Sequence, residues 1–209
     1  MNKKIVIGVT ATLAATVLIG CATTTMSDTD LTQKAGDIMR ASFQSRGQVT
    51  VERLNQDEVQ QTCTTYSDRN VPKALAEKIE KAQLAAIMKP SSGKLIGDWK
   101  AGERIAQEGR GMQFSDVAGG PTGGNCYACH QLAPQEISFG NLGPSLYNYG
   151  KLRGQSKEIV EYTYNKVYNS QAYSICSNMP RFGHQKILTP EQIADVVGLL
   201  LDPASPVNQ

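Results

Sequence analysis

The chain has 209 residues, of which 40% are hydrophobic and 19% charged, and its formal net charge is +2. This balance argues against a nucleic-acid-binding protein, which needs a surplus of Lys and Arg on one face to contact phosphates. Five Cys are too few for a small disulfide-rich scaffold, and two His exclude a His-rich metal site. The odd number of Cys means that each one has to be assigned.

The first 20 residues have the pattern of an export signal. Lys3 and Lys4 precede an uncharged, mostly apolar run over 5–19, which is too short and wrongly flanked for a transmembrane helix. The run ends in the letters LIGC, which resemble a bacterial lipobox and predict lipidation at Cys21. An ordinary secretory signal, with Cys21 incidental, remains the alternative.

Export has consequences for charge and for the thiols. Two of the 21 basic residues and none of the 19 acidic residues lie in 1–20, so the exported part carries 19 of each sign. From the export signal and the lipobox we expect a periplasmic protein that touches the membrane only through its lipid anchor. The oxidising compartment permits disulfides.

A polar tether over 21–29 precedes a stretch, 30–100, that we interpret as a helical N-terminal extension. Its first helix has one apolar stripe, formed by Leu31, Ala35, Ile38, Met39 and Phe43. Alternation over 48–54 predicts a short extended segment, and Pro72 predicts the start of a second helix. None of these residues suggests chemistry.

The remaining residues, 101–209, are predicted to form one all-α domain. We expect a short helix near 102–113 and another from Ser156 to about residue 168. The last helix has the clearest signals: Thr189 as N-cap, Pro190 in the first turn, and Gln192 in the position of a capping box. No region is dominated by strands.

The letters CYACH at 126–130 form the C-x-x-C-H motif of covalent haem c attachment. Cys126 and Cys129 are spaced to bond the two vinyl groups of one haem, and His130 then supplies an axial nitrogen. Zinc would need two further ligands at usual spacing, and a redox dithiol would need a βαβ context that is missing. The motif therefore predicts one covalently bound haem c.

The second axial ligand has two candidates downstream, Met179 and His184. Met179 precedes a proline shortly before the last helix, which is the usual position of the sixth ligand in small class I cytochromes c. The letters NLGPSL at 141–146 also resemble a segment of these cytochromes. That resemblance implies that the Pro144 carbonyl accepts the Nδ1–H of His130. It also implies a class I cytochrome c fold, carried by 101–209.

Cys63 and Cys176 remain after these assignments. An even pair in an oxidising compartment suggests a disulfide between them. A bond from either one to a partner protein, or two free thiols, are the alternatives.

The letters NMPRFGH at 178–184 and the stretches 187–189 and 199–208 resemble the SoxX family of monohaem c cytochromes, as do 46–57 and 140–144. The resemblance implies a heterodimer with a SoxA-like haem subunit, in which 30–100 docks the partner. SoxA-like haem catalysis would join thiosulfate to a cysteine of a SoxYZ-type carrier. This chain would then be the non-catalytic electron-transfer subunit of an L-cysteine S-thiosulfotransferase, and would pass electrons to a small acceptor cytochrome.

Two other functions remain open. One is a generic membrane-tethered class I cytochrome c, and the other is a ligand-binding haem sensor or peroxidase. Ligation by both His130 and Met179 would leave no open axial position and so favours electron transfer.

Overall fold

The computed structural model describes residues 26–67 and 70–209, so Cys21 and the lipobox lie outside the described residues. All of its regular elements are helical, apart from an isolated bridge between Arg46 and Val49. The elements are α1 (Asp28–Ser42), η1 (Val51–Leu54), α2 (Glu58–Thr65), α3 (Lys73–Ala85), α4 (Trp99–Gln107), η2 (Cys126–Ala128), α5 (Tyr149–Arg153), α6 (Lys157–Tyr168), η3 (Ser170–Ala172), α7 (Pro190–Leu201) and η4 (Pro206–Asn208). No helix within the described ranges is long and apolar enough to span a membrane.

The chain divides into two units, one up to Met39 and one formed by Arg40–Gln209. Helix α1 covers the predicted first helix, and none of its residues is buried. Leu31 and Ile38, from its apolar stripe, are 50% and 56% exposed.

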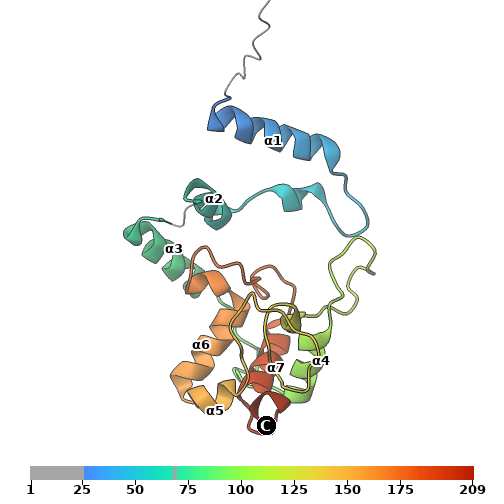
Figure 1. Cartoon of the computed structure of the whole chain (residues 1–209), viewed down its shortest axis with the longest axis vertical. Helices are drawn as coiled ribbons and strands as arrows, with labels where there is room; N and C mark the ends of the chain where they lie inside the picture. Colours follow the sequence, from blue (N-terminus) through green and yellow to red (C-terminus); the bar gives the residue numbers. More distant parts are fainter. Residues whose placement is uncertain (1–25, 68–69) are drawn as a thin grey trace, which may run out of the picture. The chain divides into compact units, whose positions relative to one another are not determined.

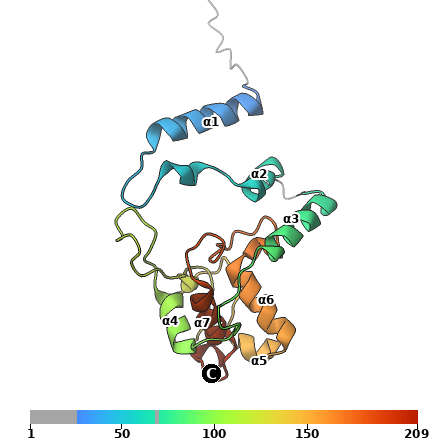
Figure 2. The ribbon, with the colours of Figure 1, turned by 180° about the vertical axis from the view of Figure 1, so that it is seen from behind.

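Helix α7 is the centre of the second unit, and α4 and α6 pack against it (Figures 1 and 2). Its predicted start is confirmed, because Thr189 and Gln192 form a reciprocal capping box and Pro190 occupies the first turn. Eight of its 12 residues are buried, including Ile193 and Val197. An N-terminus with satisfied donors and a nearly all-round apolar surface explain why this segment folds as a buried helix.

Two neighbours fit closely around α7. Helix α4 approaches it at Gly102, where a Cβ would overlap the backbone of Asp195. Helix α6 begins at the predicted cap, Ser156, whose hydroxyl accepts the Ile159 amide. Buried Tyr164 and Val167 on α6 complete the core with α7.

The extended segment predicted over 48–54 is wrong. Arg46 and Val49 close a tight turn around Gly47, whose φ is +56°, and Val51–Leu54 then forms a 3₁₀ helix. No neighbouring strand is available to pair with this segment, in the part of the chain that the structure describes. Its contacts run instead to the loop around residue 113, where Gln48 Nε2 donates to the Gln113 carbonyl at 2.9 Å.

Residues 58–98 contact the rest of the second unit at several places. Val59 of α2 and Ile79 of α3 form a small buried cluster with Ile175. Further on, Gly97 donates to the Ala194 carbonyl of α7 at 2.8 Å. The predicted boundary near residue 100 between an extension and a domain stays a prediction.

Candidate functional site

The C-x-x-C-H motif folds as one tight helical turn, η2. Cys129 and His130 both donate their amides to the Cys126 carbonyl, at 3.1 and 2.9 Å. Asn125 precedes the turn in the left-handed conformation, with φ 43°. The turn therefore brings both thiols and the imidazole of 126–130 to one short stretch of surface.

The two thiols are free, and the surroundings of Cys126 do not suit a reactive thiol. Burial, and next the neighbouring Cys129, raise the pKa of the Cys126 thiol to about 12. A thiol with a raised pKa is a poor nucleophile. The described ranges also contain no group of three or more His, Cys, Asp or Glu side chains able to hold a metal ion, so the zinc interpretation lacks its ligands.

The His130 ring is fixed from behind by the segment 140–146. Its Nδ1 lies 2.7 Å from the Pro144 carbonyl oxygen. Because a carbonyl only accepts, Nδ1 is the donor, and in the neutral imidazole the lone pair is then on Nε2. Gly143 packs directly on the ring, where a Cβ would overlap the imidazole. This arrangement is the one that the resemblance to class I cytochromes c implies for Pro144.

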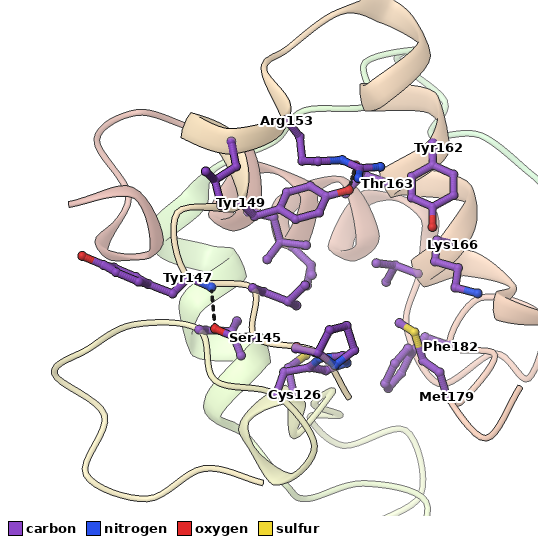
Figure 3. A pocket seen from close by; sticks show the side chains of 18 residues that line it. Cys126, Ser145, Tyr147, Tyr149, Arg153, Tyr162, Thr163, Lys166, Met179 and Phe182 are labelled. Atoms are coloured by element: carbon purple, nitrogen blue, oxygen red, sulfur yellow. Dashed lines mark hydrogen bonds between the residues drawn. The ribbon is translucent and has the colours of Figure 1, made fainter. Parts of the chain in front are cut away.

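A cavity of about 360 Å³ opens beside this turn (Figure 3). Cys126 and His130 are among its lining residues, and Figure 3 shows Met179 and Phe182 together, on a different part of the wall from Cys126. Further lining residues come from helices α5, α6 and α7 and from the segment before α5, among them Leu132, Leu146, Tyr149, Val167, Val196 and Leu200. Cys129 lies on the same turn but is not among the lining residues.

The structure separates the two candidates for a second axial ligand. Met179 lines the cavity together with His130, whereas His184 does not. His184 lines a second, more polar cavity, whose wall also includes Asp57, Arg181 and Met179. Burial and the Arg181 cation lower the pKa of His184, which favours its neutral form, although the Asp57 carboxylate acts in the opposite direction.

One side of the first cavity carries polar groups that the sequence did not indicate. Arg153 lines this side, and the Tyr149 hydroxyl is 3.0 Å from Thr163 Oγ1, whereas Lys166 lines the cavity nearer to Met179. Figure 3 shows Arg153, Tyr149 and Thr163 on the side away from Met179 and Phe182. These residues come from α5 and α6, and no local motif marks them.

The predicted pairing of the two remaining Cys is present. Cys63 of α2 and Cys176 form a disulfide with a Cα–Cα distance of 5.6 Å across a sequence separation of 113 residues. All four Cys within the described residues are thus accounted for, two as a disulfide and two as the thiols of the C-x-x-C-H turn.

The residues around the first cavity fit haem c. They offer a mostly apolar wall, a thiol turn, an imidazole with its Nε2 lone pair free, and a thioether that lines the same space. The cavity volume lies in the usual range for cofactor sites. The Arg153 cation and the hydroxyls of Tyr149 and Thr163 at one side suit the carboxylates of the haem periphery.

Comparison with known proteins agrees with this chemistry. Residues 117–202 match the family model described as cytochrome c. The chain is also similar to an uncharacterized lipoprotein from Aquifex aeolicus (strain VF5), with 39% identity over 160 residues that cover 74% of this chain and 73% of that protein.

Proposed function

This chain is a member of the cytochrome c family, an electron-transfer protein with covalently bound haem c, and we propose on that premise that it is the SoxX-type electron-transfer subunit of a thiosulfate-oxidising complex. The observation that carries its electron-transfer role is the cavity lined by both His130 and Met179. Ligation by both His130 and Met179 would leave no open axial position for a substrate, which favours electron transfer.

We assign the roles of the residues as follows. Cys126 and Cys129 would hold the haem through thioether bonds, His130 would ligate through Nε2, and Met179 would ligate through its sulfur. Pro144 keeps His130 in the tautomer that exposes Nε2, and its carbonyl makes the imidazole a stronger ligand. When bound in this way, haem c supplies reversible one-electron transfer at a raised potential.

The Sox assignment is supported by the sequence around Met179 and the C-terminal tail. The letters NMPRFGH at 178–184 form part of the cavity wall and of the loop behind it, so the resemblance falls on residues that surround the proposed site. In this role the chain accepts electrons from a SoxA-like haem subunit and passes them to a small acceptor cytochrome. Transient contact with a SoxYZ-type carrier belongs to the same proposal.

Attachment to the membrane is a separate part of the proposal. The relative from Aquifex aeolicus is named as a lipoprotein, and the LIGC letters of this chain end at Cys21. We propose that Cys21 carries the lipid and that the protein is anchored on the periplasmic side. Intact-mass measurement of the membrane fraction tests this part, because a Cys21→Ser variant should lose the lipid mass.

The central experiment is an affinity pull-down from cells grown on thiosulfate, with absorption spectra of the recovered complex. We expect a second haem subunit of SoxA type to co-purify, and thiosulfate with the carrier protein to reduce the haem of this chain. A different class I cytochrome c, which has no segment corresponding to residues 30–100 of this chain, serves as the control bait.

Two other results would replace the proposal. A solitary monomer reduced by many unrelated donors would indicate a generic tethered cytochrome c. A high-spin spectrum that changes with carbon monoxide or peroxide would indicate a haem sensor or peroxidase.

A further inference from the structure

Helix α2 is joined to the segment around Met179 at two points, one on each side of that residue. Asp57, the N-cap of α2, pairs with Arg181 through Oδ2 and Nη2 at 2.6 Å. Cys63, in the second turn of α2, forms the disulfide to Cys176. Met179 therefore lies three residues after one attachment and two residues before the other.

The Asp57 carboxylate is held rigidly at the helix end. Its Oδ1 accepts the Gln60 amide at 2.9 Å, and its own amide donates to Gln60 Oε1 at 3.0 Å, which completes a capping box. Burial alone would raise the pKa of this carboxyl, but hydrogen bonds from Gln60 and Arg181 hold it below its ordinary value. The carboxylate is therefore charged at neutral pH and presents its second oxygen to Arg181.

Arg181 depends on this contact. Its side chain is only 5% exposed, and its Nη1 is buried with no hydrogen-bond partner among the residues described by the structure. A buried cation is costly unless a carboxylate compensates its charge. Without the Asp57 charge, the guanidinium would be drawn toward water, and the backbone from 179 to 181 would move with it.

Met179 has little other polar support. Its carbonyl accepts the Ser170 hydroxyl at 2.6 Å, and its amide donates to Ser177 Oγ at 3.2 Å. Both partners lie in the same stretch of chain, 170–179. The Ile175 amide also donates to Glu80 Oε1 of α3 at 3.2 Å, whereas the attachments at Cys176 and Arg181 are the ones that tie the segment around Met179 to α2 on both sides of that residue.

We propose that α2 is a clamp for the second axial ligand, in which Asp57 and Arg181 are positioning residues that hold Met179 toward the cavity. This inference rests on the proposed ligation by His130 and Met179. It gives residues 57–63 a role in the haem site, in addition to the partner docking proposed for the extension.

The test is a competition between Met179 and an added ligand in the oxidised holoprotein. Imidazole is titrated at constant pH and ionic strength, and displacement of the sulfur is followed by loss of the absorption band at about 695 nm. The variant is Asp57→Asn, because Asn is also a good N-cap of nearly the same shape, while the change removes the charge and the second acceptor oxygen that Arg181 uses. Glu58→Gln is the matched control, since Glu58 is the next carboxylate on α2, is exposed, and has no role in the clamp.

We expect imidazole to bind Asp57→Asn at least about fivefold more tightly than wild type, which corresponds to a loss of roughly one net hydrogen bond. Glu58→Gln should match wild type. A change of less than about fivefold in Asp57→Asn, or an equal change in the control, overturns the clamp while leaving the proposed ligation intact. A wild-type protein without the band overturns both.

If Asp57→Asn yields no folded protein, the double variant Asp57→Asn with Arg181→Gln carries the same test. It leaves no uncompensated buried charge but still lacks the ion pair. Imidazole binding at least about fivefold tighter than in wild type then supports the clamp, and a smaller change overturns it.

Discussion

His130 Nδ1 lies 2.7 Å from the carbonyl oxygen of Pro144, fourteen residues along the chain. This single contact fixes three properties of the imidazole: its tautomer, its orientation and its basicity. Two further hydrogen bonds hold the loop 140–146 in place, because Gly140 and Gly143 donate their amides to the Tyr127 and Cys129 carbonyls at 2.7 and 2.8 Å. The loop is thus hydrogen-bonded to the same turn whose histidine it orients.

Replacing Met179 should change the spectrum more than replacing His184. We expect Met179→Ala to remove the band at about 695 nm in the oxidised protein, because that band reports sulfur ligation. His184→Ala, at the second cavity, should retain it. Absorption spectra of the two purified variants decide the point, and a band that persists in Met179→Ala would show that another group is the ligand.

A methyl group at Gly143 should destabilise the site. In Gly143→Ala the new Cβ would overlap the His130 ring, so we expect a loss of about 1–3 kcal/mol, typical of overpacking. Thermal unfolding followed by absorption measures it. Gly109→Ala is the control, because there a Cβ would meet only Asn125, at 3.5 Å or more. Equal stability of the two variants would contradict the packing seen around His130.

Loss of the disulfide should lower stability without affecting haem attachment. Closing a loop of this length contributes up to about 4–5 kcal/mol in the chain-entropy model. We expect Cys63→Ser with Cys176→Ser to unfold at lower denaturant concentration. Reductant should lower the denaturant midpoint of wild-type unfolding to the value of the double variant. It should leave the midpoint of the double variant unchanged. If reductant has no effect on wild type, or mass spectrometry finds two free thiols, the pairing is wrong.

Removing a cation from the cavity wall should lower the reduction potential. Positive charge near the redox centre favours the reduced state, so Arg153→Gln should shift the potential down by roughly 20–60 mV, about the size of a partly screened charge interaction. Lys157→Gln is the control, because Lys157 is exposed and does not line this cavity. Redox titration of both variants provides the measurement; equal potentials would show that the Arg153 charge is fully screened.

The sequence by itself determined the features that are encoded within a few residues. The C-x-x-C-H spacing predicted haem c, with which the cytochrome c family match agrees, and the all-α class I cytochrome c fold is confirmed. The start of α7 was predictable because Thr189, Pro190 and Gln192 satisfy the first turn locally. Signals of this kind do not depend on distant parts of the chain.

Alternation over 48–54 was misleading for the opposite reason. An extended segment requires a partner strand to satisfy its backbone, and the residues that the structure places nearby form loops and helices instead. Helix α5, with five residues, was also missed, because so short a helix has no periodic pattern of its own.

Tertiary structure decided what depends on contacts between distant residues. The sequence favoured Met179 over His184 as the second ligand, and of these two the fold placed only Met179 in the cavity with His130. Arg153 reached that cavity through the packing of its helix, and Asp57 met Arg181 across 124 residues. Local patterns determine which groups can bond haem, whereas burial and charge pairing between remote segments determine which of them lie in the same cavity and what holds them there.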